Sequence, residues 1–227
     1  MRYLALVADY DGTLASAGRV SAIVAEALER LRKSGRKVVL VTGRRLDELL
    51  EICEYIGSFD CVIAENGGLL YEPASGENTL LAEPASERLA LALRHRGVPL
   101  EMGQTIIATC VPYQTVAFDL IEELKLGEQV IFNREAVMIL PAGVNKASGL
   151  CHALRKLGIS SRRTVGIGDA ENDLAFLRMS GRAIAVANAV DSVKREAEYT
   201  TKGAAGEGVM ELIDELIATD LESPSAR

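Results

Sequence analysis

Two aspartates near the start of the chain, Asp9 and Asp11, have the types and spacing needed for acid–base or nucleophilic chemistry. They follow Leu4–Ala8, five apolar residues in a row, which is typical of a strand buried on both faces of a sheet. Gly12 comes next and allows the chain to turn. In an open α/β sheet the carboxyl ends of the strands form the ligand crevice, so both acids are expected there. We therefore predict Asp9 as a nucleophile and Asp11 as a proton donor.

A second acidic turn, GDAEND, follows a later apolar strand and contributes Asp169 and Asp173. Asp169 lies at the strand end and Asp173 one helical turn later, so both carboxylates are expected to face the crevice. The simpler interpretation is a helix N-cap with an acidic first turn, which would stabilise the helix by about 1 kcal/mol. Four carboxylates near one point repel one another unless a hard cation lies among them, and oxygen ligands favour Mg²⁺. The predicted magnesium ligands are Asp9, Asp11, Asp169 and Asp173.

Two further polar residues could bind a phosphate. Thr42 follows the predicted buried strand Lys37–Val41, and its hydroxyl can donate a hydrogen bond to a phosphoryl oxygen. Lys146 stands at the start of a predicted helix and offers a positive charge. Alone, a strand-end threonine or a solvated lysine is the more common interpretation of each. No GxxxxGK[ST] sequence occurs, so a P-loop is excluded.

Strands and helices alternate around these residues. Short apolar runs predict buried strands, and apolar residues at helical spacing predict the helices between them. The predicted strands are 4–8, 37–41, 61–64, 164–167 and 183–186, with a hairpin at 69–71 and 79–81. The predicted helices are 21–34, 46–56, 145–157, 170–179, 190–197 and 208–217. This alternation predicts an α/β fold with a doubly wound, Rossmann-like parallel sheet.

The pattern changes between residues 83 and 141. It predicts a helix–strand–strand unit written twice: helix 86–96, extended pieces at about 98–103 and 105–111, helix 113–124, and strands 129–132 and 137–140. Such units form a small antiparallel sheet with its helices on one face. We expect residues 83–141 to be an inserted α+β cap domain, and residues 1–82 and 142–227 to form one discontinuous core domain. Four cap residues could meet an acidic leaving group, although a solvated helix face is the simpler interpretation of each: Arg88, Arg94, His95 and Arg96.

The composition excludes several classes of partner. A formal net charge of −7 argues against a general nucleic-acid binder and against binding to anionic membranes. No apolar run approaches the ~18 residues of a membrane span. The cysteines form no CxxC pair and stand in apolar settings, which predicts reduced, buried thiols and a cytoplasmic location. They are Cys53, Cys61, Cys110 and Cys151. The sequence carries no signal for the oligomeric state.

Four ordered motifs resemble those of the haloacid dehalogenase-like superfamily. They are DYDGTL at 9–14, TGR at 42–44, Lys146, and GDAEND at 168–173. The turn at 65–68 and the stretch at 186–189 are similar to Cof-type members (subclass IIB), whose cap lies between the second and third motifs. The small, twice-written cap and the chain length are most similar to archaeal-type phosphoglycolate phosphatases, with sugar-phosphate phosphatases next.

The resemblance implies a Mg²⁺-dependent phosphoric monoester hydrolase that acts on a small phosphorylated metabolite, phosphoglycolate or a sugar phosphate. It implies that Asp9 attacks phosphorus to form an aspartyl-phosphate, and that Asp11 protonates the leaving alkoxide and then activates water. Asp11 would bind the ion through its backbone carbonyl. The residues implied in phosphate and substrate binding are Thr42, Gly43, Lys146 and Asn172.

Two alternatives stay open. A phosphomutase of the same superfamily would use the same motifs. A non-catalytic phospho-receiver module also combines acids, a threonine or serine and a lysine on a doubly wound sheet, but it needs only about half this length and no cap.

Overall fold

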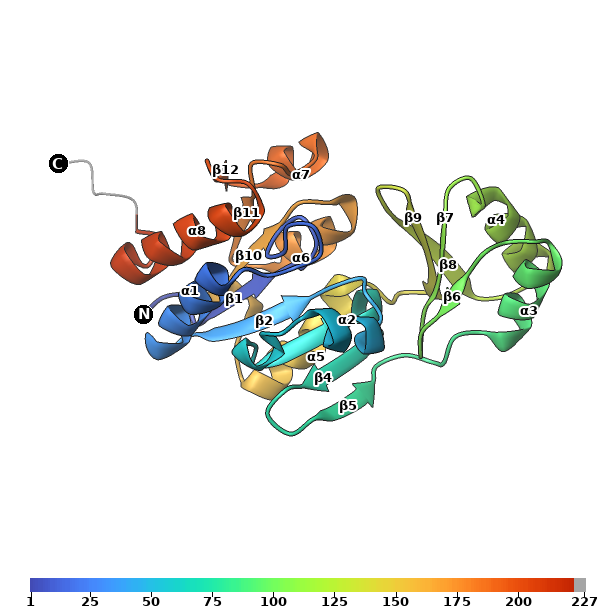
Figure 1. Ribbon diagram of the computed structural model, residues 1–227, viewed down its shortest axis with the longest axis horizontal. Helices are drawn as coiled ribbons and strands as arrows, with labels where there is room; N and C mark the ends of the chain where they lie inside the picture. The colour runs from blue at the N-terminus through green and yellow to red at the C-terminus, as the bar shows by residue number, and fades with distance from the viewer. Residues whose placement is uncertain (223–227) are drawn as a thin grey trace.

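Apolar runs form the middle of an eight-stranded sheet in the computed structural model, which describes residues 1–222 (Figure 1). Every residue of its first strand is fully buried, as expected for a strand covered on both faces. In chain order the strands are β1 (Ala5–Ala8), β2 (Lys37–Val41), β3 (Cys61–Ala64), β4 (Leu69–Glu72), β5 (Glu77–Leu80), β10 (Thr164–Gly168), β11 (Arg182–Ala185) and β12 (Tyr199–Thr200).

The strand order is β12-β11-β10-β1-β2-β3-β4-β5. Strands β12 to β3 pair in parallel, and β4 and β5 are antiparallel. The predicted hairpin therefore extends the edge of the main sheet. The direction reverses because only a tight turn at Glu65–Gly67 separates β3 from β4, whereas a parallel connection needs a crossover of about a dozen residues. The chain passes from β1 to β2 on one side and later returns to β10 on the other, so the edge between β1 and β10 is the topological switch point.

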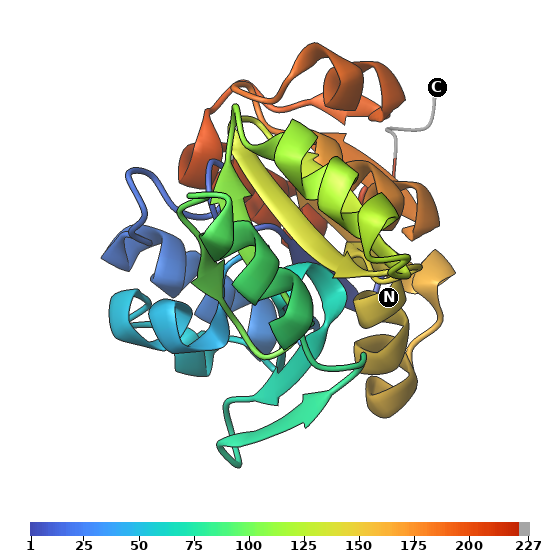
Figure 2. The same cartoon turned by 90° about the vertical axis from the view of Figure 1, so that its right-hand side faces the viewer.

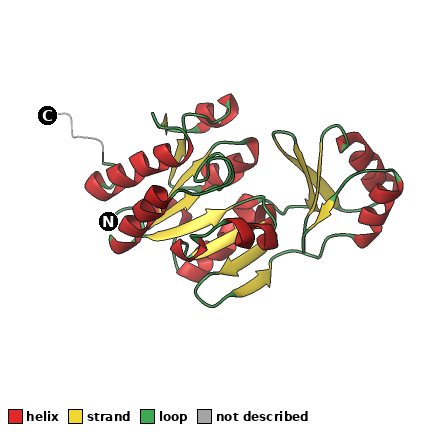
Figure 3. Cartoon of the chain, viewed as in Figure 1, coloured by secondary structure: helices red, strands yellow, loops and turns green. Residues whose placement is uncertain are grey.

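Helices cover both faces of this sheet (Figure 3). They are α1 (Ala22–Lys33), α2 (Leu46–Ile52), α5 (Lys146–Leu157), α6 (Leu174–Met179), α7 (Asp191–Glu196) and α8 (Ala205–Thr219). Helix α8 begins at Ala205, three residues before the predicted start, and two other helices differ from the prediction by four residues at one end. Helix α2 stops at Ile52 because Cys53 leaves the helical conformation, and a 3-10 turn at Glu171–Asp173 precedes α6. The two-residue strand β12 was not predicted, since so short a segment carries no periodicity.

A second, four-stranded sheet with its own apolar core lies beside the first. Its elements are α3 (Glu87–His95), β6 (Glu101–Met102), β7 (Ile107–Cys110), α4 (Gln114–Glu123), β8 (Glu128–Asn133) and β9 (Ala136–Pro141). The order β6-β7-β9-β8 is antiparallel throughout. Figure 2 shows α3 and α4 side by side on the outer face, so the other face of the sheet turns toward the main sheet. We keep the proposal that residues 83–141 form a cap, and refer to them by that name.

The cysteines follow the prediction only in part. All four are free, and Cys53 and Cys61 are buried as expected, but Cys110 and Cys151 are exposed. Cys110 ends strand β7, and Cys151 lies on an exposed part of α5 beside Met179. Apolar neighbours in sequence do not tell which side of an element faces solvent, and this explains the error. Within residues 1–222, no helix combines the length and apolarity that crossing a membrane requires.

Candidate active site

Strand β1 delivers Asp9 to the switch point. Asp9 follows the strand directly, is 5% exposed, and its backbone N–H donates to the carbonyl of Ile167 in β10. Gly12 then turns the chain with φ of +79°, and a Cβ at this position would lie 2.5 Å from Asp169 Oδ2. Glycine is thus required both by the backbone and by the close approach of the second acidic turn.

Strand β10 delivers the second acidic turn to the same place. Asp169 follows β10, and Thr13 Oγ1 donates to its Oδ1 at 3.1 Å. Asp173 folds back beneath the strand end, where its Oδ2 accepts hydrogen bonds from the backbone N–H groups of Asp169 (2.8 Å) and Ala170 (3.0 Å). A Cβ on Gly168 would lie 2.6 Å from that same oxygen, so the absence of a side chain there makes room for the carboxylate.

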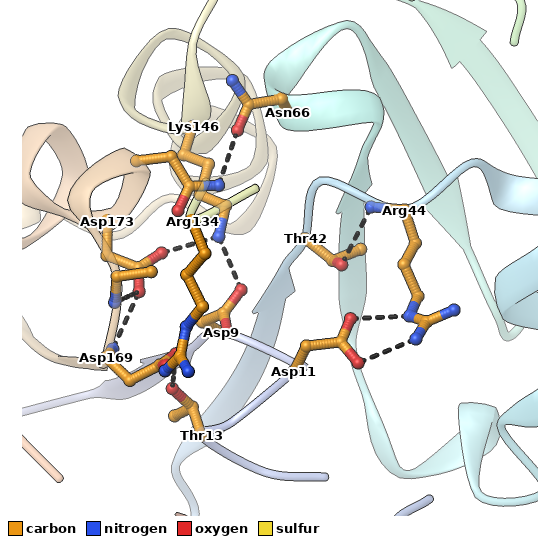
Figure 4. A network of polar contacts seen from close by, with 12 residues as sticks. Asp9, Asp11, Thr13, Thr42, Arg44, Asn66, Arg134, Lys146, Asp169 and Asp173 are labelled. Atoms are coloured by element: carbon orange, nitrogen blue, oxygen red, sulfur yellow. Dashed lines mark hydrogen bonds and ion pairs between the residues drawn. The ribbon is translucent and has the colours of Figure 1, made fainter. Parts of the chain in front are cut away.

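Lys146 joins the two turns. Its side chain is fully buried, and Nζ donates to Asp9 Oδ1 at 2.5 Å and to Asp173 Oδ1 at 2.6 Å (Figure 4). It is the first residue of α5, and Asn145 caps that helix by accepting from two backbone N–H groups. Burial acts to lower the pKa of Lys146, but the carboxylates of Asp173 and Asp9 outweigh burial and raise that pKa above its usual value. Lys146 is therefore a buried cation held by two anions.

Three carboxylates converge here. One oxygen from each of Asp9, Asp169 and Asp173 lies within 4.8 Å of the others. Burial raises the pKa of Asp9 well above its usual value, and the charges of Asp173 and Asp169 raise it further while Lys146 opposes them. Burial and Asp173 likewise raise the pKa of Asp169, against the hydrogen bonds from Arg134 and Thr13. Crowded, buried carboxylate oxygens of this kind fit a hard divalent cation.

Asp11 stands apart from this cluster. Its carboxylate accepts from Arg44 Nε at 2.6 Å and from Nη2 at 2.8 Å, a bidentate pair (Figure 4). Arg44 follows β2, the neighbour of β1, and also pairs with Glu48. The expected group of four carboxylates thus contains three, because the Asp11 side chain points toward the end of β2. A role for the backbone carbonyl of Asp11 as an ion ligand stays a prediction.

The other predicted phosphate-binding residues border the same edge. Thr42 is buried, and its Oγ1 accepts from the backbone N–H of Arg44 at 3.1 Å. A Cβ on Gly43 would lie 3.1 Å from Met138 Sδ of the cap and 3.8 Å from Asn172 Nδ2. Asn172 donates to Asn66 Oδ1 at 3.2 Å, and its buried Oδ1 has no partner among the described residues. An unpaired buried acceptor beside the carboxylates is consistent with a site that binds a further polar group.

One cap residue that the sequence did not single out reaches the cluster. Arg134 Nη2 donates to Asp169 Oδ2 at 2.5 Å. The sequence placed Arg134 in the turn between two predicted strands. It did not indicate that this turn reaches the core. The cap cations considered from the sequence lie instead on α3 or at its end, on the outer face of the cap (Figure 2). Arg96 among them pairs with Glu123.

A second unpredicted residue, Glu65, connects the core to the cap. Its carboxylate is 1% exposed and accepts from the backbone N–H groups of Gln104 (3.0 Å) and Thr105 (2.7 Å) and from the Thr105 hydroxyl (2.8 Å). The acceptors lie in the turn after β3, and the donors lie in the β6–β7 loop. This buried contact fixes one loop of the cap against the core.

Comparison with known proteins identifies the family of this chain. A family model described as haloacid dehalogenase-like hydrolase matches residues 6–94 and 113–213. The chain belongs to the haloacid dehalogenase-like hydrolase family. A relative named phosphoglycolate phosphatase, from Archaeoglobus fulgidus, is 33% identical over 213 residues, which cover 92% of this chain and 95% of the relative.

Solved structures of this family share the fold. A haloacid dehalogenase-like hydrolase from Bacteroides thetaiotaomicron superposes with a TM-score of 0.78 at 20% identity, covering 94% of this chain and 99% of that one. A subclass IIB sugar phosphatase of the family superposes with a TM-score of 0.75 at 20% identity, covering 94% and 98%. The predicted family, the predicted hydrolase class and the predicted α/β fold are confirmed.

Proposed function

We propose that this hydrolase is a Mg²⁺-dependent phosphatase that cleaves a small phosphorylated metabolite through an aspartyl-phosphate. The observation that carries the proposal is the cluster of Asp9, Asp169 and Asp173, whose carboxylate oxygens lie within 4.8 Å of one another. The buried ammonium of Lys146 pairs with Asp9 and Asp173. Phosphoryl transfer needs an in-line nucleophile, neutralisation of charge and a proton for the leaving group. We assign residues at this edge of the sheet to each of these three requirements.

Asp9 is the proposed nucleophile. Lys146 holds its Oδ1, and its Oδ2 has no hydrogen bond among residues 1–222. Attack by a carboxylate oxygen on phosphorus forms a new P–O bond as the bond to the leaving alkoxide breaks, giving an aspartyl-phosphate. Water then cleaves this acyl phosphate and restores the Asp9 carboxylate.

Asp11 is the proposed acid and base. It gives a proton to the departing alkoxide and takes one from the water that attacks the intermediate. The bidentate pair with Arg44 orients the carboxyl group at the mouth of the site.

We propose that a metal ion and polar side chains neutralise the negative charge of the phosphoryl group. Bound Mg²⁺ would neutralise the phosphoryl oxygens and polarise phosphorus toward attack. The residues that would hold it are Asp9, Asp169, Asp173 and, through its carbonyl, Asp11. Thr42 and Lys146 are proposed to bind phosphoryl oxygens, with Gly43 keeping the strand end open and Asn172 orienting its neighbours.

Phosphoglycolate is the first candidate substrate. The Archaeoglobus fulgidus relative, and a relative from Methanothermobacter thermautotrophicus that is 31% identical over 219 residues, both carry the name phosphoglycolate phosphatase. Both matches cover 92% of this chain, so the cap is included. Sugar phosphates come second, on the likeness to the sugar phosphatase structure. A cytoplasmic location remains our expectation.

A panel of phosphate esters tests the proposal. Purified protein with Mg²⁺ should release inorganic phosphate from 2-phosphoglycolate, and EDTA should stop the release. Tests with sugar phosphates and p-nitrophenyl phosphate would rank the substrates. Absence of phosphate release from the whole panel would refute the phosphatase. Turnover that depends on a bisphosphate activator would indicate a phosphomutase instead.

A further inference from the structure

A cap cation stands directly over the catalytic edge of the core. Arg134 lies at the turn between β8 and β9, where its backbone is left-handed with φ of 53°. Such a backbone is uncommon for a residue with a side chain, and here it occurs in a residue aimed at Asp169. Figure 4 shows the guanidinium beside Asp169 and Thr13.

Only Nη2 of the Arg134 guanidinium forms a hydrogen bond among the described residues, so its other N–H groups are able to bind a second partner. Its side chain is 55% exposed, and its one ion pair among the described residues is with Asp169. Asp169 is also a proposed ligand of Mg²⁺, so the ion and Arg134 compete for the same carboxylate. Asp169, if it held the ion, would leave the Arg134 guanidinium available to bind another group.

The other cations near the site are already occupied. Arg44 pairs with Asp11 and Glu48. Arg45 pairs with Glu101 and Asp47. Lys146 is fully buried between two aspartates, and the cations of α3 lie on the outer face of the cap. Arg134 is therefore the cation best placed to meet the part of a substrate that extends from the phosphate toward the cap.

We infer that Arg134 is a specificity-determining residue that binds a carboxylate on the leaving group of the substrate. The inference rests on the proposed function, because it takes the phosphate to lie against Asp9. A guanidinium presents a planar fork of donors that matches a carboxylate with two charge-assisted hydrogen bonds. A neutral alkyl or sugar leaving group has no such partner. The substrate class is then the phosphate ester of a short hydroxy acid, of which phosphoglycolate is the smallest.

Binding of two inert analogues tests the inference without turnover. In 3-phosphonopropionate a methylene replaces the bridging oxygen of phosphoglycolate, and propylphosphonate lacks its carboxylate. Calorimetric titration with Mg²⁺ present should show that the unaltered protein binds 3-phosphonopropionate roughly 10- to 100-fold more tightly. Arg134→Gln should reduce this ratio to about threefold or less, and Arg134→Lys should keep part of it since it keeps the charge but loses the fork.

A matched control separates recognition from general charge. Arg88→Gln removes one exposed cation from α3 and should leave the ratio unchanged. Glutamine and arginine should be similarly disfavoured in the left-handed backbone conformation of position 134, so Arg134→Gln should fold. Circular dichroism would check this. Two results would overturn the inference: equal binding of both analogues by the unaltered protein, or an equal loss of both in Arg134→Gln.

The same variants distinguish this inference from the proposed function. Phosphate release from 2-phosphoglycolate and from ethyl phosphate should show the same preference and the same dependence on Arg134. If the protein prefers 3-phosphonopropionate through Arg134 but hydrolyses no ester, carboxylate recognition stands and the phosphatase fails. If it hydrolyses both esters equally well and Arg134→Gln changes neither, the phosphatase stands and carboxylate recognition fails.

Discussion

The edge of the main sheet and the facing cap use charge in opposite ways. At the edge, Asp9, Asp173 and Lys146 are almost completely buried and hold one another through short hydrogen bonds. In the cap, Arg134 is more than half exposed and reaches Asp169 from the turn of a hairpin. Buried charges are retained only when they are paired, which fixes their positions, whereas an exposed arginine can exchange partners at little cost.

This difference separates two tasks. Residues fixed by burial suit chemistry, because a reacting carboxylate must stay in place as charge develops on the phosphoryl group. A half-exposed side chain on the cap suits selection, because it is accessible to a substrate that enters between cap and core. The two regions are joined at the buried carboxylate of Glu65, which fixes the loop before β7 but leaves the β8–β9 hairpin free of this contact.

The largest expected effect is at the buried edge. Asp9→Asn should lower phosphate release from every ester by about 10⁴-fold or more, because the nucleophile is lost while the shape of the side chain is kept. The loss should be the same with 2-phosphoglycolate and with ethyl phosphate, in contrast to a cap variant. Steady-state assays with both esters measure this. Activity within tenfold of the unaltered protein would remove Asp9 from the mechanism.

Asp11→Asn should have the next largest effect, a loss of about 10²- to 10⁴-fold, since it removes the proton donor but leaves the nucleophile. The phosphorylated protein should then accumulate, and acid quenching after incubation with a ³²P-labelled ester would reveal it as protein-bound label. Glu48→Gln is a matched control, because it removes the other carboxylate that pairs with Arg44. A Glu48→Gln loss as large as that of Asp11→Asn would indicate that Arg44, rather than Asp11, carries the effect.

Glu65→Gln tests the connection between the two regions. One amide oxygen must replace two carboxylate oxygens that accept three hydrogen bonds, so the free energy of unfolding should fall by about 1–3 kcal/mol. Urea unfolding measures the loss. Glu83→Gln, at an exposed position in the segment leading to α3, should change stability by less than about 0.5 kcal/mol. Equal stability of the two variants would contradict the role given to Glu65.

The smallest expected effect is the dependence of stability on pH and metal. The pKa values of Asp9 and Asp169 are raised in the folded protein, so the folded state keeps these protons to a higher pH than the unfolded state does. In EDTA, stability should therefore fall as pH rises from about 4 through the raised pKa values. Mg²⁺ should reverse this fall by favouring the ionised carboxylates, adding about 1.4 kcal/mol at tenfold the dissociation constant.

Thermal unfolding from pH 4 to 8, with and without Mg²⁺, measures both trends. Asp169→Asn should weaken the response to Mg²⁺ and reduce the fall with pH, because one of the crowded carboxylates is gone. An EDTA-treated protein whose stability rises steadily over this range would contradict the raised pKa values.

The sequence predicted most of the sheet because each central strand is a short apolar run that ends in a turn. Strands β2 and β3 begin and end at the predicted residues, and the twice-written unit of the cap has the predicted order of elements. The sequence predicted the hairpin of β4 and β5, but not that it would extend the main sheet as an antiparallel edge. Whether a hairpin joins the sheet or stands apart depends on which strand edge is free, and that is a property of the assembled fold.

The sequence by itself predicted which residues come together at this edge of the sheet. Asp9, Asp169, Asp173 and Lys146 each follow a strand or begin a helix, and parallel strands place such positions at one edge. Tertiary structure alone decided that Asp11 pairs with Arg44, that Arg134 rather than the cations of α3 faces the site, and that Glu65 connects core and cap. These contacts join residues through space, and local periodicity holds no information about how far a loop reaches or which face of a sheet turns toward its neighbour.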